Sequence, residues 1–285
     1  MTYPKHIDLH MHSTISDGTD TPVELLGKIR DAGIGLWSLT DHDDTLGCRF
    51  VSHHLVEGDP AFIPGVEFSC KDEEGKYHII GYGYDIESPE INNVVNIGHT
   101  MRMEKAKARV EFVVKEFGFE LPQEEINRFL NLPNPGKPHL GNLLVKYGYC
   151  DSKEKAINEY IDKAKIKDRF LRPETAIEGI LRAGGIPVLA HPIYGSGDQL
   201  ILGEEMDDRL RRLVGFGLKG VEGFYSGFTF KMNDMMLAHA DKYDLYVTAG
   251  SDYHGTNKMI ELGDTGLDDA SEGPARLLKF MEMFL

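Results

Sequence analysis

The sequence contains little cysteine and no long hydrophobic run. Its three cysteines, Cys48, Cys70 and Cys150, are widely spaced and form no Cys-x-x-Cys pair. This excludes a disulfide scaffold and a cysteine-based zinc site, and it favours a reducing compartment. No segment approaches the ~18 uninterrupted apolar residues of a membrane span, and the first residues show no secretory signal. We therefore expect a cytoplasmic protein that does not insert into a membrane.

The sequence also lacks the excess of basic residues that binding to duplex DNA requires. Its formal net charge is −15, whereas a protein that covers DNA phosphates is basic. The charge is uneven: residues 88–175 hold 15 Lys and Arg against 13 Asp and Glu, a net charge of +2, and the remainder carries −17. The pattern argues against a duplex DNA partner but leaves room for a small anion beside residues 88–175.

What the sequence does contain is an alternation of strand and helix patterns. Short apolar or β-branched runs predict seven strands, at residues 6–12, 35–42, 62–67, 76–83, 186–191, 220–225 and 245–252. Helical patterns lie between many of them, and strands that alternate with helices favour parallel β/α units. A length of 285 residues fits one α/β barrel, which typically needs ~250. We predict a seven-stranded β/α barrel that is closed or nearly closed.

The stretch from residue 88 to residue 172 breaks this alternation. It contains helical patterns near residues 99–117, 123–131, 138–147 and 152–165, and no convincing strand. We therefore predict two parts: a barrel formed by residues 1–87 and 173–285, and a helical cap of residues 88–172 inserted over one end of it.

Side chains of metal-ligand type stand at the ends of most predicted strands. Active sites of β/α barrels lie at the carboxyl ends of the strands, and nine candidate ligands would meet there: His10, His12, Asp17, His42, Glu67, His78, His191, Asp252 and His254. Two of the pairs, His10 with His12 and Asp252 with His254, are two residues apart, so on a strand both members face the same way. This convergence predicts a metal centre.

Nine ligands are too many for one tetrahedral zinc ion, which takes three or four protein ligands. They suit two or three divalent ions that share a bridging carboxylate, for which Glu67 is the best candidate. Mixed imidazole and carboxylate ligation suits Mn, Fe or Zn and does not choose among them. Taken singly, Asp17 could be a turn former and His78, in mid-strand, a structural histidine. Asp41 and Asp43 are interpreted as loop caps or as partners of the ligands.

Five short motifs contain seven of these nine residues. They are His10-Met-His12-Ser13, Thr40-Asp-His42-Asp43, Pro64-Gly-Val-Glu67, Leu189-Ala-His191-Pro192 and Gly250-Ser-Asp252-Tyr-His254. In this order they resemble the PHP (polymerase and histidinol phosphatase) family of metal-dependent phosphoesterases. The resemblance is strongest to the branch with a helical insertion, which includes a nucleoside 3′,5′-bisphosphate phosphatase and a ribose cyclic-phosphate phosphodiesterase. It implies a distorted seven-stranded barrel and a trinuclear metal site.

The resemblance also implies how the ligands are shared among three ions. The first ion would be bound by His10, His12, Glu67 and Asp252. Glu67 would bridge to the second, bound also by His78 and His191. The third would be bound by Asp17, His42 and His254. Asp17 stands where many family members have a histidine, and a carboxylate there is typical of this branch. His191 and Asp252 are thereby predicted to be catalytic residues as well as ligands.

The predicted substrate contacts lie in the cap and where it returns to the barrel. Lys137-Pro-His139-Leu140 matches an insertion motif that is usually Arg-x-His-Phe in the family. His139 would then be a catalytic proton donor or a contact to the substrate phosphate, and Lys137 would replace a bidentate arginine by a point charge. The alternative is a helix-capping loop with an exposed histidine. Arg172 is a further candidate phosphate contact, with a solvated helix charge as its alternative.

The resulting hypothesis is a hydrolase that cleaves a phosphomonoester of a small phosphorylated nucleotide or ribose phosphate, of the 3′,5′-bisphosphate type, by attack of a metal-bound hydroxide. Enzymatic alternatives are a cyclic phosphodiesterase on a ribose cyclic phosphate, a histidinol-phosphate phosphatase and a 5′–3′ exonuclease on short oligonucleotides. A nucleotide would need an aromatic stacking surface, for which the candidates are Tyr194, Phe224, Tyr225 and Phe228.

Two alternatives come from other classes. A catalytically silent metal-binding scaffold would predict lost ligands, and none is missing. A metal-dependent amidohydrolase would predict a carboxylated lysine at a strand end, and no lysine is a candidate. The sequence has neither Gly-x-Ser-x-Gly nor a Walker A motif, so serine-hydrolase and P-loop chemistry have no support. It leaves the oligomeric state open.

Overall fold

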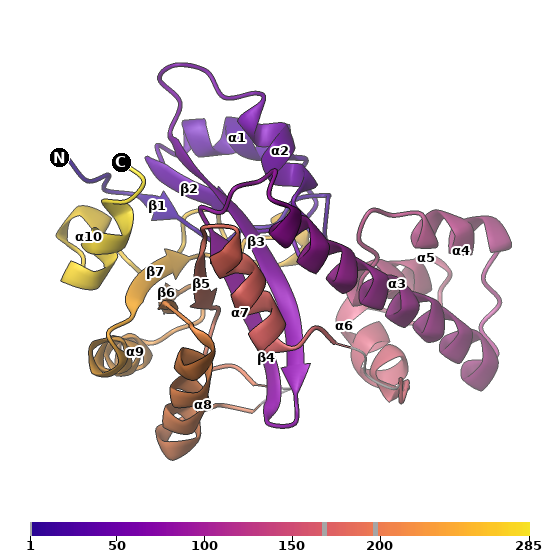
Figure 1. Cartoon of the computed structure of the whole chain (residues 1–285). Helices are drawn as coiled ribbons and strands as arrows, with labels where there is room; N and C mark the ends of the chain where they lie inside the picture. The colour runs from indigo at the N-terminus through magenta and orange to yellow at the C-terminus, as the bar shows by residue number, and fades with distance from the viewer. Residues whose placement is uncertain (1, 167–169, 196–198) are drawn as a thin grey trace.

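The computed structural model describes residues 2–166, 170–195 and 199–285, and its seven strands form one sheet (Figure 1). The strands are β1 (Ile7–Asp8), β2 (Leu36–Leu39), β3 (Ala61–Asp72), β4 (Gly75–Tyr82), β5 (Ile186–Leu189), β6 (Gly220–Tyr225) and β7 (Tyr246–Gly250). Their order in the sheet follows the chain. Leu9 N donates to Ala249 O at 3.0 Å and Asp252 N donates to His10 O at 2.8 Å. These bonds join the two edges, so the sheet is a nearly closed barrel, and the predicted barrel is confirmed.

The strands are not all parallel, and on this point the sequence-based expectation is wrong. β4 pairs antiparallel with both β3 and β5, whereas the remaining neighbours pair parallel. Only residues 73 and 74 separate β3 from β4, and a connection that short makes a hairpin, because a parallel crossover needs a dozen or more residues. The first half of β4 therefore lies at the same rim as the carboxyl ends of its neighbours.

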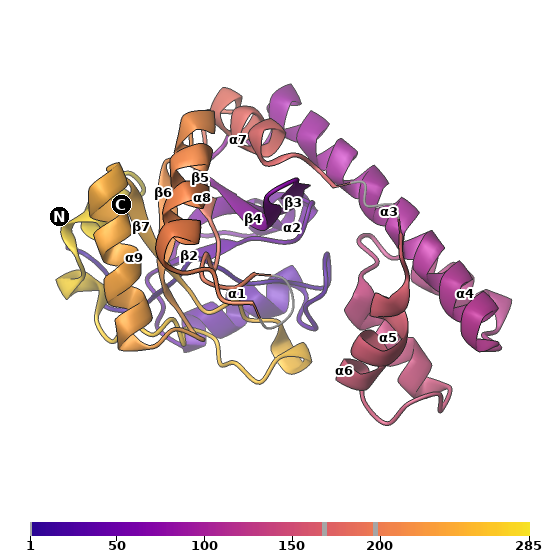
Figure 2. The same cartoon turned by 90° about the horizontal axis from the view of Figure 1, so that it is seen from below.

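Helices pack around the sheet, as Figure 2 shows from below. They are α1 (Pro22–Asp31), α2 (Leu46–Ser52), α7 (Pro173–Arg182), α8 (Gly203–Phe216), α9 (Phe230–Tyr243) and α10 (Ala275–Met281). α1 begins with a capping box, in which Thr21 and Glu24 satisfy each other's backbone N–H groups. Its apolar stripe of Leu25, Leu26 and Ile29 is fully buried against the sheet, which fixes the loop between β1 and α1 over the barrel rim.

The helices within residues 89–163 form a lobe beside the barrel (Figure 1). It contains α3 (Pro89–Phe117), α4 (Gln123–Leu130), α5 (Lys137–Lys146) and α6 (Lys153–Lys155), then a π-helical turn (Ala156–Tyr160) and a 3₁₀ turn (Ile161–Lys163). α3 starts ten residues earlier than predicted, and three short pieces replace the helix expected at 152–165. The lobe has an apolar cluster of its own, which includes Val113, Phe129, Leu140 and Leu144. No helix in the described part of the chain combines the length and the apolarity that crossing a membrane requires.

Candidate metal centre

The nine predicted ligands come together around the carboxylate of Glu67. This side chain is 1 % exposed and lies near the end of the barrel formed by the loops after β1, β2, β5 and β7. Its oxygens lie within 3.4 Å of ring nitrogens from five histidines: His78 at 2.8 Å, His42 at 3.0 Å, His191 at 3.1 Å, His12 at 3.3 Å and His10 at 3.4 Å. One carboxylate at the centre of five imidazoles is the arrangement expected of a bridging ligand.

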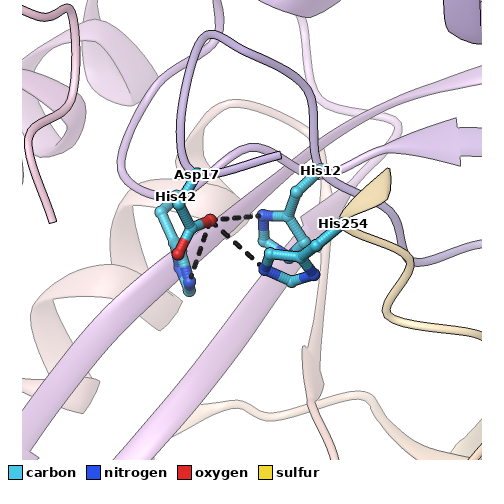
Figure 3. A group of neighbouring side chains, drawn as sticks. All are labelled: His12, Asp17, His42 and His254. Carbon is cyan, nitrogen blue, oxygen red and sulfur yellow. Dashed lines mark ion pairs between the residues drawn. The ribbon is translucent and has the colours of Figure 1, made fainter. Parts of the chain in front are cut away.

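A second group of ligands surrounds Asp17, on the loop after β1 (Figure 3). Asp17 Oδ1 lies 3.2 Å from His254 Nε2, 3.8 Å from His12 Nδ1 and 4.0 Å from His42 Nε2. Three strand ends thus supply histidines that face one carboxylate oxygen. The turn that carries Asp17 is tight, because a Cβ at Gly18 would lie 2.2 Å from His12 O.

Asp252 connects these two groups. Its Oδ1 lies 3.5 Å from His10 Nε2, 3.3 Å from His12 Nε2 and 3.4 Å from His254 Nδ1. Its Oδ2 accepts a hydrogen bond from Tyr225 Oη at 2.8 Å and forms an ion pair with Lys258. Oδ1 therefore faces the histidines, while Tyr225 and Lys258 fix Oδ2.

The antiparallel direction of β4 explains how a mid-strand histidine reaches this rim. Glu67 on β3 lies opposite Ile80 on β4, and His78, two residues earlier, is on the same face and diagonal to it. His78 Nδ1 lies 2.8 Å from Glu67 Oε1. In a parallel strand the same position would lie away from the carboxyl-end rim.

Three residues of the site have left-handed backbone conformations that L-residues rarely adopt. The φ angles are +50° at Asp43, +28° at His191 and +58° at Asp252. Such conformations typically cost 1–3 kcal/mol each and persist where the surrounding structure fixes them. Asp43 directly follows His42, and His191 and Asp252 each lie two residues after a strand end, so the strain turns side chains into the centre.

The atoms that face one another are suited to bind metal ions. His10 Nε2 lies 3.2 Å from His12 Nε2, so the two ring nitrogens face a common point. Asp17 Oδ1 and His42 Nδ1 are buried without a hydrogen-bond partner among the described residues. Metal ligation would satisfy these atoms, and imidazole with carboxylate is a donor set for divalent transition metals. The residues present therefore fit divalent metal ions.

The carboxylates of the site are held in their charged form. Burial acts to raise the pKa of Glu67, but the surrounding histidines, His78 first, outweigh it and hold the pKa well below its ordinary value. Burial likewise opposes ionisation of Asp252, and Lys258 with His10 holds its pKa well below the usual range. Both ligands thus have the charge that metal binding requires.

Several residues that the sequence analysis missed support the ligands. Glu222 on β6 contacts His10 Nδ1 at 2.9 Å and accepts a hydrogen bond from His191 N at 2.6 Å. Arg102 on α3 donates twice to Asp43 Oδ2, at 3.0 and 2.7 Å. Asp43 was interpreted as a loop cap or a ligand partner, and it accepts from Ser69 N as well. The available signal was Glu222 itself, a carboxylate inside an otherwise apolar strand.

A cavity of about 540 Å³ opens between the metal centre and the helical lobe. Asp17, His42 and His78 line it on the barrel side. The other walls include six basic residues, namely Lys76, Arg102, Lys105, Arg109, Lys137 and Lys165. Pockets that hold a whole small ligand typically measure 300–1,000 Å³. The cavity therefore has the size of a nucleotide-like ligand and a charge suited to an anion.

The three predicted substrate contacts have different positions relative to this cavity. Lys137 lines it and pairs with Asp162 at 2.5 Å. His139 is not among the residues that line it: its Nδ1 accepts from Gly136 N at 3.1 Å at the start of its own helix, and its side chain is partly buried, not exposed as the helix-capping alternative expected. Arg172 is half exposed and is paired with Glu73 and Glu174 outside the cavity. The geometry therefore gives no support to a phosphate contact by Arg172, and the roles of all three stay predictions.

Three of the aromatic residues expected to stack on a nucleotide lie beside His191, and none of them is among the residues that line the large basic cavity. Tyr194, Tyr225 and Phe228 form a cluster with ring centroids 5.3–5.8 Å apart, and Tyr225 lies 5.6 Å from the His191 ring. Phe224 instead is buried in the barrel core.

The chain is similar over nearly its whole length to bacterial phosphoester hydrolases, although no family model matches it. A 5′-3′ exoribonuclease of Haemophilus influenzae is 28% identical over 262 residues, which is 91% of this chain and 93% of that protein. A 3′,5′-nucleoside bisphosphate phosphatase of Chromobacterium violaceum is 28% identical, with 87% of each chain covered. A phosphoribosyl 1,2-cyclic phosphate 1,2-diphosphodiesterase of Eggerthella lenta is 30% identical, with coverage of 87% of this chain and 94% of that one.

Solved structures agree with these relatives in fold. A Bifidobacterium adolescentis protein named as a metal-dependent phosphoesterase has a TM-score of 0.81 and 26% identity, with 95% of each chain covered. A Chromobacterium violaceum protein named an amidohydrolase, with bound sulfate, has a TM-score of 0.80 and 25% identity, with 98% of this chain and 96% of that chain covered. The curated relatives are all hydrolases of phosphoester bonds. This chain therefore belongs to the PHP family of metal-dependent phosphoesterases and is a hydrolase that acts on phosphoester bonds.

Proposed function

We propose that this enzyme removes a phosphate group from a small nucleotide that carries more than one phosphate, of the nucleoside 3′,5′-bisphosphate type. The observation that carries the proposal is the basic cavity beside the metal centre. A substrate with one phosphate at the metal ions needs no further cations, whereas six basic side chains line the remaining walls. A second anionic group of the same substrate accounts for them.

The nine residues around Glu67 and Asp17 are the proposed ligands of two or three divalent ions, Mn, Fe or Zn. Such ions lower the pKa of water and neutralise charge on phosphoryl oxygens. Glu67 and Asp252 hold the imidazoles in place. Glu222 fixes the His10 ring, because its carboxylate accepts the Nδ1 proton and leaves Nε2 directed at the centre.

Residues 88–172 are proposed to act as a cap on this site. The lobe contributes Arg102, Lys105, Arg109 and Lys137 to the cavity wall. Phe170, where the chain returns to the barrel, adds an aromatic surface, with Lys105 Nζ 3.8 Å from its ring centroid. A ligand between cap and barrel would be largely shielded from water, which strengthens its charge interactions.

The test is phosphate release from adenosine 3′,5′-bisphosphate by the full chain with added Mn²⁺. We expect rapid release with Mn²⁺ and none after treatment with a chelator. Adenosine 5′-monophosphate is the matched control, because it lacks the second phosphate, and its KM should be at least tenfold higher. Equal kinetic constants for both substrates would contradict the proposal.

A second candidate is stepwise hydrolysis of a short 5′-phosphorylated oligoribonucleotide. It is favoured by the similarity to the Haemophilus influenzae protein named a 5′-3′ exoribonuclease. The same assay with a 5′-phosphorylated diadenylate distinguishes the candidates, because only an exonuclease releases adenosine 5′-monophosphate from it.

A further inference from the structure

A second, smaller cavity lies on the other side of His78 from the cap. Its volume is about 150 Å³, and its lining includes His78, His191, Lys76, Tyr194 and Arg209. It is below the ~300 Å³ at which pockets begin to hold a whole ligand. It therefore has room for one group of a substrate whose remainder lies elsewhere.

Arg209, on α8, is the unusual residue of this cavity. It is 7 % exposed, and charged side chains are rarely buried unless they are paired. Among the described residues it forms no ion pair. Its one hydrogen bond runs from Nη1 to Lys76 O, at 3.3 Å, and its guanidinium lies 4.6 Å from the centroid of the Tyr77 ring. The other N–H groups of its guanidinium are not enclosed without a partner. They can point into the two cavities that Arg209 lines.

Two carboxylates near Arg209 have other partners: Glu205 accepts a hydrogen bond from Gln199 at 2.9 Å, and Asp72 is engaged as well. Asp72 pairs with Arg212 and accepts a hydrogen bond from Tyr77 Oη at 3.0 Å. Arg212, three residues after Arg209 on the same helix, thus already neutralises the charge of Asp72. The hairpin turn leaves space for the Arg209 fork, since a Cβ at Gly75 would come within 3.1 Å of its Nη2.

The neighbouring surface limits how far an anion can extend. Arg209 and Tyr77 also line a cavity farther from the metal centre, together with Glu74, Glu205 and Asp208. These carboxylates repel a long polyanion. The part of this surface that favours an anion therefore has room for one phosphate, between His191 and Arg209. A nucleic acid strand that runs along α8 is disfavoured.

We propose that Arg209, with Lys76, forms a subsite for one phosphate group of the substrate other than the one being hydrolysed. This inference rests on the proposed function and gives the second phosphate a narrower place: of the six basic residues that line the larger cavity, Lys76 also lines the smaller one, so the phosphate would lie where the two cavities meet at Lys76. The ligand chemistry is a phosphate, which either a terminal monoester or the internal diester of a dinucleotide supplies. Arg209 is a binding residue here and takes no part in the bond-breaking step.

The test compares Arg209→Met with wild type on three substrates and Mn²⁺. The substrates are p-nitrophenyl phosphate, which has only the scissile phosphate, adenosine 3′,5′-bisphosphate and 5′-phosphorylated diadenylate. We expect KM to rise at least tenfold for the bisphosphate, for the dinucleotide or for both, with kcat within twofold, and p-nitrophenyl phosphate kinetics within twofold. An effect on the bisphosphate identifies a terminal phosphate in the subsite, and an effect confined to removal of the 5′-phosphate from the dinucleotide, which leaves the diester intact, identifies the diester.

Two further variants keep the outcome interpretable. Arg211→Met removes the same charge from the same helix at an exposed position paired with Asp207 and Asp208, and it should leave all three KM values unchanged. Arg209→Lys should recover part of the lost affinity. Equal losses on all three substrates, or none on the two larger ones, would overturn the subsite. Failure of wild type to hydrolyse the bisphosphate and the dinucleotide would instead overturn the proposed function.

Discussion

At the scale of single residues, Glu222 shows how one side chain fixes two ligands. Its Oε1 accepts from His10 Nδ1, which sets the tautomer that leaves Nε2 free, and its Oε2 accepts from the backbone of His191, whose φ is +28°. The side chain is fully buried. Its negative charge therefore supports an imidazole on β1 and a strained backbone after β5 at the same time.

Replacing Glu222 by Gln should weaken the metal centre without removing a ligand. Partners of this kind typically contribute 10–100-fold in metal affinity or activity. We expect a loss of kcat/KM in that range for p-nitrophenyl phosphate, partly recovered by excess Mn²⁺. Glu178→Gln, at an exposed surface pair, is the control and should have no effect. Full activity of Glu222→Gln at limiting Mn²⁺ would contradict the role of Glu222 in holding His10 and His191.

The convergence of the candidate ligands was predictable from the sequence, but their partners were not. Glu67 and Asp252 end strands predicted from the sequence, and such positions point to one rim in any barrel of this kind, although β3 in fact continues past Glu67 to Asp72. Glu222 stands within its strand, and Arg102 comes from a helix 59 residues away from its partner Asp43. Those contacts depend on how the lobe and the barrel pack, which local sequence patterns do not encode.

At the scale of elements, the seam between β1 and β7 determines where the first two ligands lie. Gly250 ends β7, and a Cβ there would lie 2.3 Å from His10 Cβ and 2.7 Å from Glu222 Oε1. The strands approach so closely because this position has no side chain. The seam thus places β1 ligands beside Asp252, which follows β7.

Gly250→Ala should disrupt this seam. Overpacking a filled core typically costs 1–3 kcal/mol, and the displaced atoms belong to His10. We expect unfolding in urea at a lower midpoint, with a loss of about 2 kcal/mol, and a fall in Mn²⁺-dependent activity. Gly27→Ala is the control: it is a helix-interior glycine with open space at its Cβ position, so it should gain about 0.5–1 kcal/mol. The same change in stability at both positions would refute the argument.

Strand direction is the part of the element-scale prediction that failed, and its cause is local. Periodicity identifies a strand such as 76–83 but contains no information on the direction in which it runs. The signal available in the sequence was the short gap of eight residues between the strands predicted at 62–67 and 76–83, because a parallel crossover needs a dozen or more residues. Recognising that hairpin would also have explained why His78, in mid-strand, belongs to the site.

The helix α3 is fixed to the barrel by a nearly buried ion pair. Arg102 and Asp43 are 2.7 Å apart, with side chains 11% and 3% exposed. Arg102→Met would leave the Asp43 charge without a partner, which typically costs 3–5 kcal/mol. We expect a loss of about 3 kcal/mol in urea unfolding, together with reduced activity. Arg128→Met, in an exposed pair on α4, should cost less than about 1 kcal/mol. Equal losses of stability in the two variants would show that the Arg102–Asp43 pair does not fix α3 to the barrel.

At the scale of the whole molecule, the lobe contacts the loops that carry candidate metal ligands, after β2 and β7, at three separate places. Arg102 binds Asp43 beside His42, and Asn134 Nδ2 donates to the carbonyl of His42 itself. Lys153 Nζ donates to Asn257 O at 2.6 Å, and Asn257 Nδ2 in turn donates to Asp17 O at 2.8 Å. The position of the lobe and the geometry of the ligands are therefore linked through short chains of hydrogen bonds.

This linkage predicts that divalent metal stabilises the whole fold and not the barrel rim alone. A ligand that binds only the folded state adds about 2.7 kcal/mol at 100 times its Kd. At that concentration we expect Mn²⁺ to raise the free energy of unfolding of chelator-treated protein, measured in urea, by about 2.7 kcal/mol for each ion bound, and so to raise the urea midpoint. Amide exchange should slow in α3 and α5 of the lobe, as well as at the ends of β1 and β7. Glu67→Gln, which retains the fold's packing but loses the central charge, should show a much smaller shift. A midpoint that Mn²⁺ leaves unchanged would contradict metal binding at this centre, and protection confined to the strand ends would contradict the coupling of lobe and site.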